Sequence, residues 1–269
     1  MSSLRFDADA AEYRNLAEKV TSDIATAALR HISPFKSDMR VLDAACGTGA
    51  ATIAITDLAR QQSLPSPSVV GIDVAEGMVK TYQAKFGSEA WPTVSSMVQD
   101  AQKMEAFGEA LFDLVFMNFG LMHVPDGVAC MKEIYRVLRP GGRALVTTWK
   151  SAGVAKIAQG AARALGVDYV TSPIKDGWDT KERLLSVVEA GGFRTENVKV
   201  AIEQTTIEKG DGEGIVKSMS SSFWRPSVED WRAEDKQRWT AAVRAQLTPE
   251  QRRTGSVSMV AWICVAKKD

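Results

Sequence analysis

The chain has few of the residues that hold metal ions or build disulfide frameworks. Its 269 residues include three cysteines and two histidines, and Cys46, Cys130 and Cys264 lie far apart without a Cys-x-x-Cys pair. Structural zinc and iron–sulfur clusters need several thiolate or imidazole ligands at close spacing. The sequence therefore predicts no metal site, and the isolated cysteines indicate a reducing compartment.

The chain also lacks an excess of charge of either sign and lacks long apolar runs. Lysine plus arginine equals aspartate plus glutamate, at 33 each, so we expect no nucleic-acid or acidic-membrane partner. No apolar run reaches about 18 residues, and the N-terminus has no signal-peptide core. These absences favour a cytoplasmic protein without a membrane partner. The length suits one large α/β domain with insertions, or at most two small domains.

A glycine turn, Asp43-Ala-Ala-Cys-Gly47-Thr-Gly49, follows a short apolar stretch and precedes a helical pattern. Glycine at both positions suggests that the backbone passes close to a ligand, whose space a Cβ would occupy. The third glycine of a dinucleotide fingerprint is missing, because Thr52 stands there. Asp43 suits a ligand that carries an ammonium group. The turn therefore favours S-adenosylmethionine over NAD.

Apolar runs and helical patterns alternate along the chain, which predicts βαβ units and a parallel sheet. Tyr82 and Lys85 lack the Tyr-x-x-x-Lys spacing of short-chain dehydrogenases, which further weakens the interpretation as an NAD-binding protein. The expected strands are 40–45, 68–73, 93–99, 112–118, 143–149, 193–203 and 256–267. The expected helices lie within 5–32, at 50–62, 76–86, 127–138 and 180–190, and in a charged insertion at 211–252. A Pro-Gly-Gly turn at 140–142 is expected to precede the strand at 143–149.

Polar side chains stand where four expected strands end, and ligands of open α/β sheets bind at that edge. Asp43 ends the first strand and could face an ammonium group, and Asp73 ends the second and could accept both ribose hydroxyls of a nucleoside. Asp100 follows the third strand and could meet the adenine amine. Asn118 ends the fourth, beside the expected reacting centre. Each alone could be a helix cap, but four in register indicate one nucleoside site.

With these four motifs, residues 38–150 resemble a class I S-adenosylmethionine-dependent methyltransferase. The resemblance implies a Rossmann-like, seven-stranded, mostly parallel sheet with helices on both faces, whose last strand, 256–269, is antiparallel. It implies one domain over 1–269, with a helical lid at 1–36, a cofactor-binding core at 37–150 and a substrate side at 151–255. The residues implied to bind the cofactor are Tyr13, Asp43, Ala45, Cys46, Gly47, Gly49, Asp73, Val74, Met78, Asp100, Ala101, Asn118 and Phe119.

The second half of the chain resembles small-molecule methyltransferases of fungal secondary metabolism, such as the gliotoxin bis-thiomethyltransferase. The segments that carry this resemblance are 177–183, 190–194 and 222–225. It implies transfer of a methyl group to S, N or O of a small, largely apolar metabolite. Aromatic residues in the lid and insertions are expected to line the acceptor site: Phe6, Trp149, Trp178, Phe223 and Trp224.

His123 lies on the loop after the fourth strand, at the expected mouth of the site. It could be a general base, because imidazole exchanges protons near neutral pH, or it could only position its neighbours. Cys46 is interpreted as a small packing residue of the turn. Two other functions stay open: a nicotinamide-dependent oxidoreductase, and a methyltransferase-like scaffold without catalysis.

Overall fold

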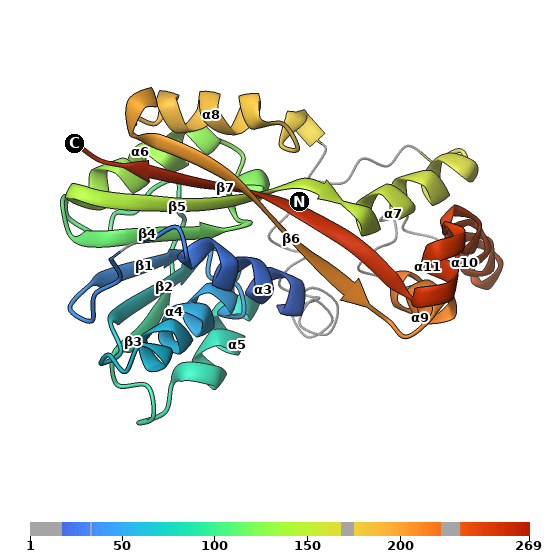
Figure 1. Cartoon of the computed structure of the whole chain (residues 1–269), viewed down its shortest axis with the longest axis horizontal. Coiled ribbons are helices and arrows are strands. Elements are labelled where there is room, and N and C mark those ends of the chain that lie inside the picture. The colour runs from blue at the N-terminus through green and yellow to red at the C-terminus, as the bar shows by residue number, and fades with distance from the viewer. Residues whose placement is uncertain (1–17, 33, 168–174, 222–231) are drawn as a thin grey trace. The chain divides into compact units, whose positions relative to one another are not determined.

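The computed structural model describes residues 18–32, 34–167, 175–221 and 232–269 (Figure 1). The strands are β1 (Arg40–Ala44), β2 (Ser68–Asp73), β3 (Val94–Val98), β4 (Phe112–Asn118), β5 (Leu138–Ala152), β6 (Val198–Glu208) and β7 (Ser256–Lys267). The α-helices are α3 (Glu18–Leu29), α4 (Ala50–Gln61), α5 (Glu76–Phe86), α6 (Gly127–Val137), α7 (Gly153–Ala164), α8 (Lys181–Ala190), α9 (Gly212–Met219), α10 (Ala233–Gln246) and α11 (Pro249–Thr254). Short 3-10 turns are η1 (Leu121–His123), η2 (Lys175–Gly177) and η3 (Thr195–Asn197). None of these described helices could cross a membrane.

The strands form one sheet in the order β3-β2-β1-β4-β5-β7-β6. β1 pairs in parallel with β2 and β4, β2 with β3, and β4 with β5. The central strands β1 and β4 are buried along almost their whole length, as parallel strands covered on both faces must be. The sheet is mostly parallel, with antiparallel pairing among the last strands, so the expected Rossmann-like fold is confirmed.

The chain divides into two compact units. The core unit comprises residues 1–148, 180–203 and 262–269, and the helical unit comprises 149–179 and 204–261. Within the core unit, α3, α4 and α5 lie on one side of the strands and α6 and α8 on the other (Figure 1). Because α3 packs against α4, it joins the layer that begins at the glycine turn.

The helical unit has its own small core. α10 packs against α7 and α9, and the side chain of Trp239 on α10 is fully buried. The indole N–H of Trp239 donates a hydrogen bond to the carbonyl of Met219 at 2.9 Å, which satisfies its buried polar atom. On the surface of this unit, Arg244 holds the carboxylate of Glu213 through two nitrogen–oxygen contacts of 2.7 Å. The expected insertion at 211–252 is therefore helical in its described parts.

Two expected strand boundaries are wrong. β5 begins at Leu138 rather than 143, and the Pro-Gly-Gly segment lies within the strand as an irregularity: Phe112 pairs with Leu138, and Leu114 pairs with Arg143. β6 runs over 198–208 rather than 193–203, because residues 195–197 form a 3-10 turn first. Pro and Gly are typical of turns, but a bulge accommodates the same residues. The part of the expected helical region that lies at 5–17 falls outside the described residues.

Candidate functional site

The turn between β1 and α4 is built from left-handed backbone. The φ angles of Ala45, Gly47 and Gly49 are 57°, 51° and 93°. The Cys46 N–H donates to the carbonyl of Ile72 at 2.8 Å, so the turn stays attached to β2. The Gly49 N–H closes the turn on the Cys46 carbonyl, also at 2.8 Å. Glycine adopts this conformation without strain, whereas Ala45 does so only because its surroundings hold it there.

The two glycines serve different purposes. A Cβ at Gly47 would meet no atom of the described chain within 4 Å, so this position faces open space, as we expected of a ligand surface. A Cβ at Gly49 would lie 2.3 Å from Cε2 of Phe86 and 3.2 Å from Cδ2 of Tyr82. The expectation that the Gly49 backbone passes close to the ligand stays a prediction. Gly49 makes room for the packing of α5 beneath the turn.

Asp43 is buried beside the turn, with 1% of its surface exposed. Its Oδ2 accepts hydrogen bonds from the Thr52 amide at 3.1 Å and from the Thr52 hydroxyl at 2.7 Å. Because that hydroxyl proton is engaged, the Tyr82 hydroxyl, 2.8 Å away, is the donor to Thr52 Oγ1. Thr52, which replaces the third glycine of a dinucleotide fingerprint, thus orients the carboxylate.

The other carboxylate oxygen of Asp43, Oδ1, is buried and has no hydrogen-bond partner within the described chain. Burial raises the pKa of Asp43 from 3.8 to about 7, although the two Thr52 hydrogen bonds oppose that rise. A buried acceptor without a partner is costly, since it forgoes the hydrogen bonds it would make to water. Asp43 therefore suits a ligand that brings a positively charged donor.

Asp73 supports the turn from the end of β2. Its Oδ2 accepts the Gly47 N–H, and its Oδ1 accepts the Ala75 N–H, each at 2.9 Å. A carboxylate has about four acceptor sites, so one carboxylate can accept several hydrogen bonds at once. Val74, the next residue, exposes 57% of its surface although it is apolar. This combination fits a nucleoside, with its sugar against Asp73 and its base against Val74.

The ends of β3 and β4 are also fixed by local hydrogen bonds. Asp100 Oδ1 accepts the Gln102 N–H at 2.8 Å, and the neighbouring Ala101 is buried. Asn118 donates to the carbonyl of Thr21 on α3 at 3.1 Å and accepts the Thr147 hydroxyl from β5 at 2.8 Å. Phe119 is buried and has a φ of 58°, a conformation in which a large residue is strained.

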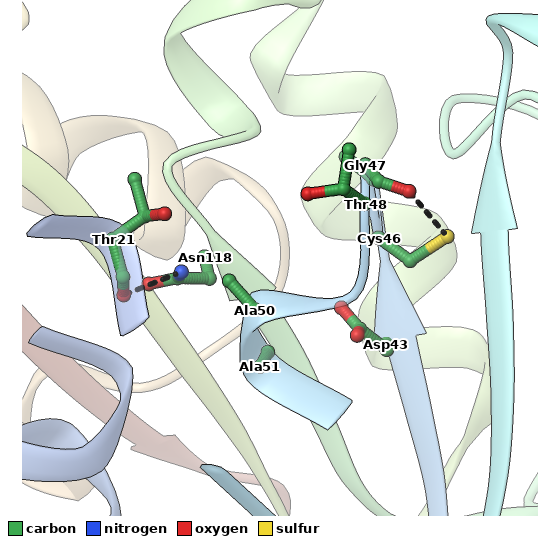
Figure 2. Close-up of a pocket in the computed structure, with 9 residues that line it drawn as sticks. Thr21, Asp43, Cys46, Gly47, Thr48, Ala50, Ala51 and Asn118 are labelled. Atoms are coloured by element: carbon green, nitrogen blue, oxygen red, sulfur yellow. Dashed lines mark hydrogen bonds between the residues drawn. The ribbon is translucent and has the colours of Figure 1, made fainter. Parts of the chain in front are cut away.

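A pocket lies between α3, the glycine turn and the end of β4 (Figure 2). Its empty volume is about 280 Å³, which includes space open to solvent. In Figure 2, Thr21 and Asn118 lie on one side and Cys46, Gly47 and Thr48 on the other, with Asp43 below the turn. The residues that line it are Thr21, Asp43, Ala45, Cys46, Gly47, Thr48, Ala50, Ala51 and Asn118.

Five of the expected cofactor residues line this pocket: Asp43, Ala45, Cys46, Gly47 and Asn118. Burial raises the pKa of the Cys46 thiol well above its usual value, which fits a packing residue rather than a nucleophile. Seven other expected positions do not line it: Gly49, Asp73, Val74, Met78, Asp100, Ala101 and Phe119. Met78 is buried in the first turns of α5.

Sequence reasoning missed Thr21, Thr48, Ala50 and Ala51 in the pocket lining. The small residues after Gly49 could have been found, since a helix start facing a ligand needs small side chains. Thr21 could not, because only tertiary packing brings α3 to the end of β4. Within the described ranges, no group of three or more His, Cys, Asp or Glu side chains is arranged to hold a metal ion.

The remaining expected residues lie elsewhere or outside the described ranges. His123 ends the short turn η1 and is half-buried, and its backbone N–H donates to the Gly120 carbonyl at 2.9 Å. It does not line the pocket. Trp149 and Trp178 belong to the helical unit and are buried, with 8% and 4% of their surfaces exposed. Four residues expected from the sequence to bind the cofactor or the acceptor lie outside the described residues: Phe6, Tyr13, Phe223 and Trp224.

Known proteins resemble the chain most over the region that builds this site. A family model described as a methyltransferase domain matches residues 42–146. Demethylmenaquinone methyltransferase of Lactococcus lactis is 35% identical over 105 residues, which are 39% of this chain and 40% of that protein. The chain thus spans two fifths of the length of that relative.

Other similarities extend over most of the chain. Methyltransferase ktnA of Aspergillus niger is 26% identical over 259 residues, covering 86% of this chain and 84% of that protein. A solved structure of Haemonchus contortus phosphoethanolamine N-methyltransferase 2, in complex with S-adenosylhomocysteine, matches the fold with a TM-score of 0.57 at 17% identity. That match covers 98% of this chain and 58% of the other.

The fold, the glycine turn with its buried acid, and the domain matched over residues 42–146 resemble those of class I S-adenosylmethionine-dependent methyltransferases. This similarity agrees with the resemblance that the sequence motifs indicated, and S-adenosylmethionine is the cofactor of that class. The site fits this cofactor on two observations: Asp43 Oδ1 has no partner in the described part of the chain, and Gly47 faces open space.

The role of Asp73 can be tested by calorimetry with S-adenosylhomocysteine. We expect Asp73→Ala to lower the affinity at least about tenfold, since a charged hydrogen bond contributes about 1.5–3 kcal/mol. The same change removes the acceptor of the Gly47 and Ala75 N–H groups. Thermal unfolding without ligand should therefore also shift downward. Unchanged affinity in the folded variant would rule out contact between Asp73 and the ligand.

Proposed function

We propose that the protein transfers a methyl group from S-adenosylmethionine to a heteroatom (S, N or O) of a small, largely apolar metabolite. The observation that carries the cofactor half of this proposal is the buried Oδ1 of Asp43, which borders the pocket without a hydrogen-bond partner in the described chain. The ammonium group of the cofactor's amino acid would supply that partner.

The other residues would bind the rest of the cofactor. The open side of Gly47 would lie against its amino acid portion, and Asp73 would accept its ribose hydroxyls. Asp100 would meet the adenine amine. Apolar side chains at the strand ends and on α5 would enclose the adenine: Val74, Met78, Ala101 and Phe119. The bound cofactor supplies a methyl group already activated on a sulfonium.

The chain's own part is then to align the acceptor and to exclude water. Proximity and orientation can contribute about 7–11 kcal/mol to lowering a barrier. Asn118 is suited to this task because hydrogen bonds to α3 and β5 fix its amide at the pocket wall. An ordered wall keeps the acceptor in line with the sulfonium, so little further chemistry is required of the side chains.

The acceptor class rests on two lines of support. The similarity to the fungal ktnA methyltransferase extends over 86% of the chain and so includes the helical unit, whereas the quinone-pathway relative matches only 39%. The equal numbers of acidic and basic residues favour an uncharged acceptor over a polyanion. We therefore place the acceptor among small secondary metabolites and propose that the protein works in the cytoplasm.

A panel assay tests this function. The full chain is incubated with methyl-labelled S-adenosylmethionine and small thiols, phenols, amines and amides, and products are identified by mass spectrometry. We expect label on one class of heteroatom, and none with Asp43→Asn. Binding of S-adenosylhomocysteine without transfer to any acceptor would favour the scaffold alternative. Label on carbon would contradict the heteroatom assignment.

Turnover of a His123→Gln variant distinguishes a positioning role of His123 from a role as general base. We expect His123→Gln to lower turnover less than tenfold and to leave the pH–rate profile unchanged, because a sulfonium reacts readily with a well-placed soft nucleophile. If His123 were a general base, its removal would lower turnover about 10²–10⁴-fold. A loss of that size, with cofactor affinity intact and the pH dependence gone, would contradict positioning. It would also favour an alcohol or amide acceptor over a thiol.

A further inference from the structure

Three side chains from distant parts of the chain meet at the glycine turn. Glu18 begins α3, Thr48 lies in the turn and Lys85 is near the end of α5. Glu18 Oε1 accepts hydrogen bonds from the Thr48 hydroxyl at 3.0 Å and from the Lys85 ammonium. Lys85 also donates to the backbone carbonyl of Thr48 at 2.9 Å. We call this group the α3 latch.

The α3 latch differs from the other ion pairs on the same two helices. The side chains of Glu18 and Lys85 expose 19% and 26% of their surface. Lys19–Asp23 on α3 exposes 80% and 36%, and Lys80–Glu76 on α5 exposes 69% and 68%. Exposed pairs contribute little because water screens them, whereas a shielded pair with extra hydrogen bonds contributes more. Glu18 also lies in the first turn of α3, where the helix dipole favours negative charge.

The latch ties α3 to the wall of the pocket. One turn further along α3, Thr21 lines the pocket, and its carbonyl accepts the side-chain amide N–H of Asn118, which lines the same side of the pocket. The C-terminal end of α3 is held separately, since His31 contacts the carboxylate of Glu203 at 3.0 Å. Separation of the start of α3 from Thr48 would widen the space between Thr21 and the turn, and this separation requires the latch to break.

We propose that Glu18 and Lys85 are positioning residues that hold α3 against the glycine turn and so limit the rate at which the cofactor product leaves. This inference rests on the proposed cofactor site. Neither residue needs to contact the ligand: each acts through Thr48 and the backbone of the turn. The latch should therefore govern dissociation more than association.

The experiment measures association and dissociation of S-adenosylhomocysteine by stopped flow in the full chain. We expect Glu18→Gln and Lys85→Met each to raise the dissociation rate at least about fivefold, with association changed less than twofold. The double variant should be no faster than the faster single variant, because both break one unit. Lys85→Arg, which keeps the charge and donors, should restore most of the slow dissociation.

Matched controls are the exposed pairs on the same helices. Lys19→Met and Lys80→Met remove one lysine each and should leave both rates within twofold of the wild type. Dissociation rates of Glu18→Gln and Lys85→Met within twofold of the wild type would overturn the proposal. A second result would also overturn it. In that result the affinity falls because association slows, the ligand-free protein unfolds at a lower temperature, and Lys85→Arg does not restore the affinity. No acceptor is used, so these outcomes are independent of the acceptor assay.

Discussion

Asp43→Asn should lower the affinity for S-adenosylhomocysteine about 100-fold while the ligand-free protein stays folded. The amide oxygen can still accept the Thr52 hydrogen bonds, but the amide nitrogen then takes the place of Oδ1. This amide nitrogen is a hydrogen-bond donor and faces the ligand's ammonium group, which is also a donor. The carboxylate oxygen of Asp43 would instead accept a hydrogen bond from that ammonium. A charged hydrogen bond contributes about 1.5–3 kcal/mol, and each 1.4 kcal/mol is tenfold in affinity. Calorimetry and circular dichroism together test this.

The same residue should give two opposite pH trends. Burial raises the pKa of Asp43 in the folded, ligand-free protein to about 7, from 3.8. Between these values the folded state holds a proton that the unfolded state has lost. This contribution to stability is therefore complete below about pH 4 and is lost as pH rises to about 7. Affinity should change in the other direction, rising toward pH 7, because the ligand's ammonium needs the carboxylate.

The difference between wild type and Asp43→Asn isolates this titration from that of other carboxyl groups. Free energies of unfolding and affinities are measured from pH 5 to 7.5 for both proteins. The wild type should bind with release of a proton near pH 6, and the variant should not. If both proteins show the same pH dependence of affinity, Asp43 does not face the ammonium group.

Gly49→Ala should destabilise the ligand-free fold by about 2–5 kcal/mol. Left-handed backbone costs a residue with a Cβ about 1–2 kcal/mol, and overpacking of a core costs about 1–3 kcal/mol. Both apply here, since φ is 93° and the new Cβ would lie 2.3 Å from Cε2 of Phe86. Denaturant unfolding measures the loss. Gly49→Ala combined with Phe86→Leu should recover part of it.

Gly47→Ala is the matched comparison. Its φ of 51° also lies in the left-handed region, but nothing in the described structure lies within 4 Å of the new Cβ. We expect a loss of only about 1–2 kcal/mol in stability and a loss of ligand affinity of at least about tenfold. Equal destabilisation by the two substitutions would show that the packing against Phe86 is unimportant.

The alternation of apolar strands and amphipathic helices was enough to predict the sheet and its layers, because each element's side-chain period is local. Boundaries were less well predicted where local preference and sheet pairing disagree. The Pro-Gly-Gly segment at 140–142 favours a turn by itself, yet pairing with β4 keeps it within β5. The start of β6 moved from 193 to 198 because η3 precedes it.

The sequence by itself determined the class of the cofactor, because the glycine turn, the acid before it and the acids at later strand ends are read in order along the chain. Only the tertiary structure decided what each of these residues does. A Cβ at Gly49 would meet Phe86 on α5, and Thr52 orients Asp43. The latch joins residues 30 and 67 positions apart, Glu18 with Thr48 and with Lys85. Such contacts depend on how helices pack across a sheet, and no local pattern along the chain encodes which side chain lies behind a turn.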